Sequence, residues 1–174
     1  DGRRLLQLNE GWAVHSIREP DTVFTGGIWD HFLALPDLAA DDGRMLVVGS
    51  AGGTTKRAFA ALRPDVAMTS VELDPAVTRA GRTWFGLTGP VVAADGRPFL
   101  RRTRESWDVV HVDAYRQPYI PFYLTTREFF ELARSRLAPG GVLSINVGAA
   151  PSDPRMVEAV SATMRAVFPI VVRY

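Results

Sequence analysis

The chain has 174 residues, of which 47% are hydrophobic, and this predicts a single main domain with one sizeable core. Its 20 Lys and Arg nearly balance its 19 Asp and Glu. This balance excludes a general attraction to nucleic acid or to an anionic membrane surface. Because the chain has no cysteine, disulfides, thiolate-bound zinc and a cysteine nucleophile are excluded, and the composition fits a cytoplasmic protein.

Two short apolar runs near the N-terminus flank the turn sequence Asn9-Glu10-Gly11, and this pattern predicts a small β-hairpin. The segment from Gly26 to Leu35 has the apolar spacing of a helix, which Pro36 ends. We therefore predict that residues 1–36 form a hairpin and a linking helix. Residues 37–174 are predicted to form the main domain.

From Arg44 onward, short β-branched runs alternate with helical segments, which is typical of parallel βαβ units. The predicted strands are Met45–Val48, Met68–Leu73, Val91–Ala94, Val109–Val112, Val142–Val147 and Ile170–Arg173. The predicted helices are Thr54–Leu62, Pro75–Phe85, Pro98–Arg102, Thr125–Leu137 and Asp153–Val167. This alternation predicts an α/β fold with a doubly wound, mostly parallel sheet that binds ligands at the carboxyl ends of its strands.

A glycine-rich loop and an acidic residue follow the first two of these strands. The loop is Gly49-Ser50-Ala51-Gly52-Gly53-Thr54, and its glycines would let the backbone approach a ligand closely. Glu72 follows Gly49 at nearly the ~20-residue interval at which an acid accepts the ribose hydroxyls of a nucleoside. We predict that Glu72 contacts the ribose, whereas Asp74 caps the helix that begins at Pro75.

Acidic residues also follow the next two strands. The third strand ends at Ala94-Asp95-Gly96, where the carboxylate would either accept from the adenine amine or cap the next helix. The fourth strand ends at Asp113, and an aromatic loop that contains Tyr115 and Tyr119 follows it. We therefore predict that residues 37–174 form a Rossmann-like nucleoside-binding domain that lacks its last strand. Its nucleoside pocket would be lined by acids at one edge of the sheet.

Other cofactor classes fit the sequence less well. The loop lacks the G-x-G-x-x-G spacing of a dinucleotide site, so nothing prepares a place for a pyrophosphate. Because no His, Asp and Glu residues have metal-ligand spacing, we predict no metal. We interpret His15 and His111 as structural residues, and leave open whether His31 faces the pocket.

Taken together, these motifs resemble the spermidine synthase (polyamine aminopropyltransferase) family. The resemblance covers about Leu5 to Val147 and includes the Gly-rich loop, Val71-Glu72-Leu73-Asp74, Asp95-Gly96, Asp113 and Pro139-Gly140-Gly141. The chain is similar in particular to bacterial relatives in which such a domain follows membrane-spanning helices. That arrangement would explain a chain that begins at Asp1 without an initiator Met, and it implies a location at the cytoplasmic face of a membrane.

The resemblance implies the fold of class I S-adenosylmethionine-dependent methyltransferases and transfer of an aminopropyl group to an amine acceptor such as putrescine. The donor would be decarboxylated S-adenosylmethionine or S-adenosylmethionine, and Asp113 would be the catalytic carboxylate. The residues expected to bind the donor are Gly49, Ser50, Gly52, Gly53, Glu72, Asp95 and Gly96. Those expected to bind the acceptor are Tyr115, Tyr119 and Asp30. The partners expected are a homodimer mate and membrane helices in a longer chain.

The sequence departs from the family pattern at several positions. Arg116 lies near the place of a second acid in the catalytic loop, and a guanidinium repels a polyamine. Ile28 and Asp30 replace the expected Tyr and Glu. Ala51 replaces an Asp that would repel the carboxylate of intact S-adenosylmethionine, so the preference for the decarboxylated donor should be weak.

Two alternatives to aminopropyl transfer stay open. A methyltransferase would use the same fold with the same Glu72 and Asp95, and Ala51 permits the intact donor. A noncatalytic nucleoside-binding domain is compatible with the altered acceptor site. The fold alone does not separate these functions.

Overall fold

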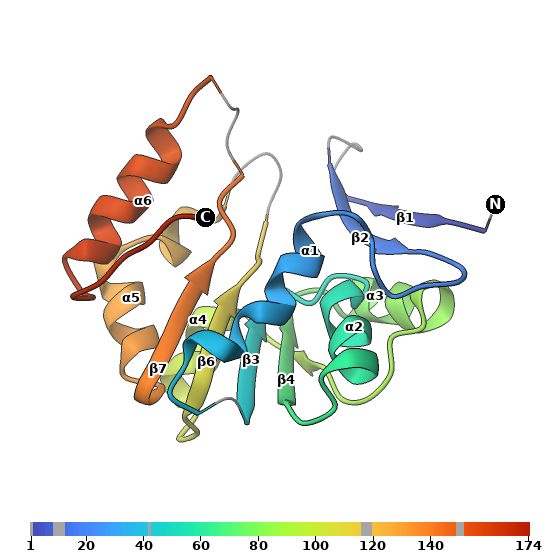
Figure 1. Cartoon of the computed structure of the whole chain (residues 1–174), viewed down its shortest axis with the longest axis horizontal. Coiled ribbons are helices and arrows are strands. Elements are labelled where there is room, and N and C mark those ends of the chain that lie inside the picture. The colour runs from blue at the N-terminus through green and yellow to red at the C-terminus, as the bar shows by residue number, and fades with distance from the viewer. Residues whose placement is uncertain (1, 9–12, 42, 116–119, 149–151) are drawn as a thin grey trace.

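The computed structural model describes residues 2–8, 13–41, 43–115, 120–148 and 152–174. Its centre is a five-stranded parallel sheet in the order β5-β4-β3-β6-β7 (Figure 1). The strands are β3 (Arg44–Val48), β4 (Ala67–Glu72), β5 (Val92–Ala93), β6 (Trp107–Val112) and β7 (Leu137–Ile145). This order confirms the predicted doubly wound α/β fold, in which the chain builds the sheet outward from β3 on both sides.

Helices cover both faces of this sheet. They are α2 (Thr54–Leu62), α3 (Pro75–Ala80), α4 (Gly96–Arg102), α5 (Arg127–Arg134) and α6 (Arg155–Arg165). A π-helical turn, η4 (Gly81–Phe85), continues α3, so that together they span the predicted helix 75–85. A short 3-10 helix, η5 (Phe122–Leu124), precedes α5.

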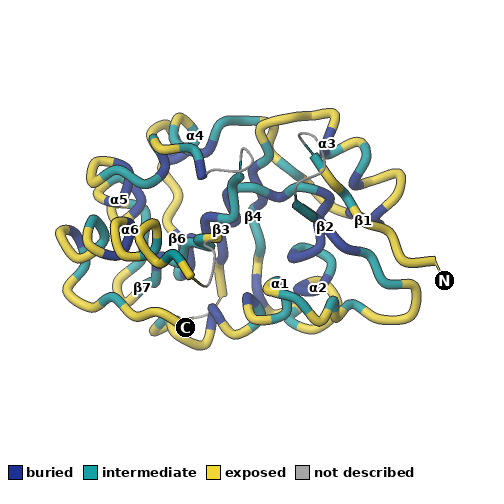
Figure 2. Tube along the Cα trace, turned by 90° about the horizontal axis from the view of Figure 1, so that it is seen from above, coloured by how far each residue is buried: buried dark blue, intermediate teal, exposed yellow. Residues whose placement is uncertain are grey.

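Residues of β3 alternate between two hydrophobic clusters because successive side chains of a strand point to opposite faces. Met45 and Val47 pack with Phe59 of α2, whereas Leu46 and Val48 pack with Phe129 and other residues of α4, α5 and α6. All four strand residues are buried, as expected for a parallel sheet covered on both faces. Figure 2 shows this buried centre running along β3, β4 and β6 between more exposed helices.

The N-terminal hairpin consists of β1 (Arg4–Gln7) and β2 (Val14–Arg18), which pair antiparallel. The predicted linking helix is instead a short α1 (Ile28–His31) followed by two 3-10 turns, η2 (Phe32–Ala34) and η3 (Pro36–Leu38). Side-chain hydrogen bonds join the hairpin to the glycine-rich loop and to α2. The Gly52 N–H donates to Ser16 Oγ at 2.8 Å, and the Ile17 N–H donates to Thr54 Oγ1 at 2.8 Å. The hairpin therefore packs directly on the sheet domain, and the division at residue 36 stays a prediction.

Two predictions about the C-terminal part of the chain were wrong. The segment Ile170–Arg173 forms no strand, and Ile170 and Val172 are 80% and 74% exposed. A β-branched run becomes a strand only where a neighbour supplies hydrogen bonds, and this segment pairs with none of the described strands. The strand β7 begins at Leu137, which was predicted to end a helix, and residues 138–141 bulge out of register between the pairs Trp107–Leu137 and Val109–Val142.

Candidate functional site

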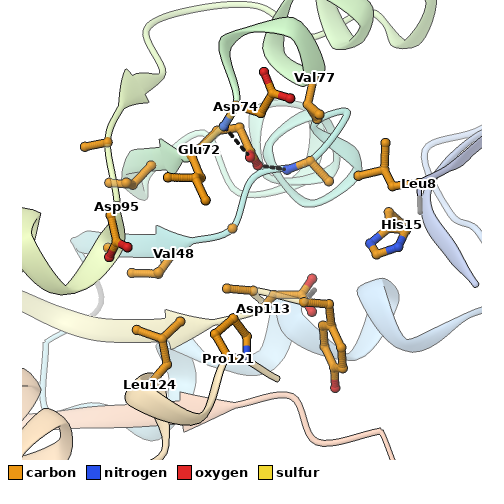
Figure 3. Close-up of a pocket in the computed structure, with 18 of the residues that line it drawn as sticks. Leu8, His15, Val48, Glu72, Asp74, Val77, Asp95, Asp113, Pro121 and Leu124 are labelled. Atoms are coloured by element: carbon orange, nitrogen blue, oxygen red, sulfur yellow. Dashed lines mark hydrogen bonds between the residues drawn. The ribbon is translucent and has the colours of Figure 1, made fainter. Parts of the chain in front are cut away.

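A cavity of about 400 Å³ lies at the carboxyl ends of β3, β4 and β6. This is the point where the strand order reverses, and open α/β sheets bind their ligands there. The hairpin closes one side of the cavity with Leu8 and His15 (Figure 3). In this view Asp95 lies at the opposite side, with Glu72 and Asp113 between them.

The cavity is lined by acids. Glu72, Asp74, Asp95 and Asp113 contribute to its wall, and none of the lining residues that the structure describes is Lys or Arg. Each acid stands just after, or at the end of, a parallel strand, so the strand register brings together residues up to 41 positions apart in the sequence. Such a wall favours a ligand that carries positive charge.

Glu72 is fixed by two backbone groups. The Ala51 N–H donates to its Oε2 at 2.8 Å, and the Asp74 N–H donates to its Oε1 at 3.1 Å (Figure 3). Ala51 adopts the left-handed conformation with φ of 44°, which is uncommon for a residue other than glycine. The glycine-rich loop therefore aims a backbone donor at the carboxylate, and the remaining lone pairs of Glu72 face the cavity.

Asp74 and Asp95 both cap helices. Asp74 Oδ1 accepts from the Ala76 N–H at 2.7 Å, which confirms the predicted cap of α3. Asp95 Oδ1 accepts from the Arg97 N–H at 2.9 Å, and its Oδ2 accepts from the Tyr123 hydroxyl at 2.9 Å. The helix-capping role that the sequence left open for Asp95 is therefore present, and its contact with adenine stays a prediction.

Asp113 follows β6 and is surrounded by protein on most sides. Its N–H donates to Val48 O at 2.8 Å, and its Oδ1 accepts from Asn146 Nδ2 at 2.8 Å. Burial raises the pKa of Asp113 to about 7, and the hydrogen bond from Asn146 opposes that rise. A carboxyl with this pKa changes between its acid and base forms near neutral pH, which suits proton transfer.

Glycines of the loop and at position 96 also allow close packing within the protein, and their predicted contact with a ligand stays a prediction. A Cβ on Gly49 would lie 2.4 Å from Asp113 O, and one on Gly53 would lie 2.6 Å from Leu87 Cδ1. A Cβ on Gly96 would lie 2.3 Å from Val48 Cγ1. These glycines let protein segments pack closely, because the atoms that exclude a side chain belong to the protein itself.

The structure brings together most, but not all, of the predicted site residues. Those in the cavity wall are Gly49, Glu72, Asp95, Gly96, Asp113 and Tyr115. Those outside the wall are Ser50, Gly52, Gly53 and Asp30. Asp30 accepts hydrogen bonds from the N–H groups of Thr25 and Gly26, so its carboxylate stabilises that turn. Tyr119 and Arg116 lie outside the described residues.

Two polar residues of the site were missed by the sequence analysis. His15 lines the cavity, and its Nε2 is buried without a hydrogen-bond partner among the described residues. Burial lowers its pKa more than the nearby Glu72 raises it, so the ring is neutral at pH 7. Asn146 contacts Asp113 from β7, and no motif in the sequence pointed to it. His111 is fully buried, as the structural interpretation predicted, and its ring lies 4.1 Å from that of Phe32.

Comparison with known sequences and structures extends this description. The spermine/spermidine synthase domain matches residues 38–174. The chain belongs to the spermine/spermidine synthase family. It is 34% identical over 169 residues to a probable polyamine aminopropyl transferase of Bifidobacterium longum, which covers 95% of this chain and 38% of that relative. It is 33% identical to the polyamine aminopropyltransferase of Vibrio vulnificus over 72% of this chain and 43% of that relative.

Solved structures place the same fold in two kinds of protein. A probable spermidine synthase from Corynebacterium glutamicum superposes with a TM-score of 0.72 and 31% identity, over 81% of this chain and 53% of that one. Human methyltransferase-like protein 13 in complex with SAH superposes with a TM-score of 0.66 and 25% identity, over 79% of this chain and 67% of that one. This family member thus has the class I methyltransferase fold, and it spans less than half the length of the two curated relatives named above.

Two other kinds of feature are absent from the residues that the structure describes. No helix there is long and apolar enough to cross a membrane. In the same residues, no three His, Cys, Asp or Glu side chains gather in a way that could hold a metal ion.

Proposed function

We propose that this chain is the donor-binding and catalytic domain of an aminopropyltransferase that uses an S-adenosylmethionine-type co-substrate. The observation that carries the proposal is the cavity at the switch point of the sheet, which is lined by four acids and by no described Lys or Arg. A sulfonium donor and an amine acceptor are both cationic, so this wall suits them and opposes a phosphorylated dinucleotide. The family membership and the aminopropyltransferase relatives support the same reaction.

The order of residues along the cavity matches the parts of such a donor. Asp95 at one side would accept a hydrogen bond from the adenine amine. Glu72 in the middle would accept hydrogen bonds from the ribose hydroxyls (Figure 3). Asp113 and His15 would lie toward the sulfonium end. The Nε2 of His15 is buried and has no hydrogen-bond partner among the residues that the structure describes, so a polar group of the ligand could bind to it there.

The donor supplies an alkyl carbon that its positively charged sulfur already activates for transfer. The protein must therefore orient the acceptor amine and take up its proton as the new C–N bond forms and the C–S bond breaks. The raised pKa of Asp113 supports it as the group that takes up this proton, because a carboxyl with a pKa of about 7 is half ionised at neutral pH. We propose an amine such as putrescine as the acceptor. Tyr115 would contact the acceptor through its ring, because its hydroxyl already donates to Asn146 O and accepts from the Gly148 N–H.

The proposed function is tested by calorimetry with each donor and by the mass of the product formed after putrescine is added. We expect binding of the donor and a product heavier by one aminopropyl group. Asp113→Asn should lower turnover by roughly 10² to 10⁴ with donor affinity little changed, because the variant keeps its hydrogen bond to Asn146 but loses the base. Wild-type turnover in Asp113→Asn would show that this carboxylate is not the base.

Methyl transfer is the second candidate, and Ala51 favours it. Ala51 lines the cavity beside Glu72, and an alanine there leaves room for the carboxylate of intact S-adenosylmethionine. We expect the wild type to discriminate between the two donors by less than ~100-fold, about 2.7 kcal/mol. Transfer of a methyl group instead of an aminopropyl group in the mass assay would establish this alternative.

The variant Ala51→Asp tests the role of this position directly. Asp tolerates the left-handed conformation that Ala51 adopts, and it would add a negative charge to the wall. We expect Ala51→Asp to raise the preference for the decarboxylated donor, measured as the ratio of the two dissociation constants. Ala51→Asn is the matched control, because it has the same shape without the charge. An equal effect of both variants would contradict an electrostatic cause.

A further inference from the structure

Asn146 stands one residue beyond β7 and is fixed on the strand that neighbours Asp113. Its N–H donates to Val112 O at 2.9 Å, which continues the ladder between β6 and β7. Its C=O accepts from the Tyr115 hydroxyl at 2.9 Å, and that hydroxyl in turn accepts from the Gly148 N–H at 2.5 Å. The backbone of Asn146 is therefore held on both sides, and its side chain has a defined direction.

That direction brings the amide Nδ2 to 2.8 Å from Asp113 Oδ1. Among the described residues, this is the one hydrogen bond recorded for the carboxylate of Asp113, and Oδ2 receives none. Figure 3 shows Asp113 in the middle of the cavity. The two oxygens of Asp113 thus have different surroundings, since an amide holds one and no described residue donates to the other.

The other polar groups around this cavity do not stabilise a charge on Asp113. Glu72 of β4, Asp95 before α4 and Asp74 before α3 are acids, whereas His15 of β2 is neutral at pH 7. Burial, helped by the nearby Asp113 charge, raises the pKa of Tyr115 to about 12, so Tyr115 is also neutral. Because no described Lys or Arg lines the cavity, the amide of Asn146 is the group that favours the ionised carboxylate.

We propose that Asn146 is a positioning residue that holds Oδ1 of Asp113 and thereby directs Oδ2 toward the proton of the acceptor amine. Its amide also keeps the carboxylate ionised at a lower pH than burial alone would allow. The catalytic part of this inference rests on the proposed function, whereas the contact and its effect on ionisation do not. Asn146 acts through Asp113 and need not touch either substrate.

The experiment measures the titration of the Asp113 carboxyl by carbon NMR in the wild type and in Asn146→Leu. The variant keeps the approximate size of the side chain and all backbone hydrogen bonds but removes the donor. We expect the midpoint of the Asp113 titration to rise by about one to two pH units, the scale of one hydrogen bond to a charged group. The midpoint of the rise in turnover with pH should move by the same amount.

Two further variants separate this effect from a general disturbance of β7. Asn146→Gln keeps an amide and should shift the titration less than Asn146→Leu does. Ser144→Ala, two residues earlier on the same strand, removes a hydroxyl that contacts His111 and should leave the Asp113 titration unchanged. Thermal unfolding of each variant checks its fold, and Asn146→Ala replaces Asn146→Leu if the latter does not fold.

The outcomes distinguish the inference from the proposed function. An unchanged Asp113 titration in Asn146→Leu would overturn the inference, whatever the enzyme does. An equal shift in Ser144→Ala would also overturn it. A shifted titration with an unshifted pH dependence of turnover would support the contact but remove Asp113 from its proposed role as the base.

Discussion

At the scale of single residues, the site depends on carboxylates whose surroundings differ. Glu72 and Asp95 each accept two hydrogen bonds from the protein, whereas Asp113 accepts one and has a raised pKa. The hydrogen bonds fix the orientation of Glu72 and Asp95, which suits binding, whereas a buried carboxyl with fewer partners suits proton transfer. Under the proposed function, donor binding and proton transfer would thus be divided among these carboxylates according to their local hydrogen bonds.

Glu72→Gln tests the ribose contact. Both oxygens of Glu72 accept backbone N–H groups, so an amide NH₂ in place of one oxygen would face either Ala51 or Asp74 without a hydrogen bond. We expect donor binding measured by calorimetry to weaken by about 1.5 to 3 kcal/mol, the scale of hydrogen bonds to a charged group. Asp74→Asn is the control, because it retains the cap of α3 and should bind the donor nearly as the wild type does. Wild-type affinity in folded Glu72→Gln would refute the assignment.

Asp113 should make the stability of the protein depend on pH. Its folded pKa of about 7 exceeds the ordinary value of 3.8, so the folded state holds a proton that the unfolded state releases between these pH values. The free energy of unfolding should therefore fall as the pH rises from about 4 to about 7, by at most about 4 kcal/mol from this group.

Asp113→Asn should remove the fall in the free energy of unfolding that is expected between about pH 4 and pH 7. The variant should be more stable than the wild type at pH 8, and the difference should vanish toward pH 4, as measured by urea unfolding at several pH values. Asp41→Asn, an exposed carboxyl, serves as the control. A difference between wild type and Asp113→Asn that is constant with pH would contradict the raised pKa.

At the scale of elements, the hairpin is held against the glycine-rich loop by the hydroxyl of Thr54. This oxygen accepts from the Ile17 N–H at 2.8 Å and donates to Ile17 O at 3.0 Å, and both residues are buried. Because His15 lies two residues before Ile17, the same contact positions one side of the cavity. The first turn of α2 therefore supports both the loop and the hairpin.

Thr54→Val should weaken this contact. The valine has the same shape but leaves the buried N–H and C=O of Ile17 without their partner, so we expect the free energy of unfolding to fall by about 1 to 3 kcal/mol. Thr55→Val is the matched control, because Thr55 is buried on the same helix but does not contact the hairpin in this way. Equal losses in the two variants, measured by urea unfolding, would mean that the effect belongs to the helix.

The elements also show where sequence patterns succeed. The helix 54–62 was predicted with its observed bounds, since glycines precede it and its apolar residues recur with helical spacing. The strand at Ile170–Arg173 was predicted from β-branched composition alone, and composition does not provide a pairing partner. The bulge at residues 138–141 was missed because proline and glycines are typical of turns, whereas here they interrupt a strand.

At the scale of the whole molecule, the sequence was sufficient for the sheet and for the acids at its edge. Alternating strands and helices have few arrangements, so Glu72, Asp95 and Asp113 could be placed at one edge without coordinates. His15 and Asn146 could not be assigned to the site from the sequence. Their places in it come from the docking of the hairpin and from the pairing of β6 with β7. A lone His or Asn in an apolar segment carries no signal of its tertiary neighbour.

The contact between Gly49 and Asp113 has a consequence for how this family can diversify. A side chain at position 49 would strike the backbone of Asp113, so the turn that follows β3 and the start of the loop after β6 must change together or stay as they are. The atoms nearest to such a side chain belong to Asp113 and Ala114, so the constraint acts at the start of that loop. Under the proposed function, a change of acceptor would come from substitutions farther along the loop after β6, while the turn after β3 keeps its shape beside the donor pocket.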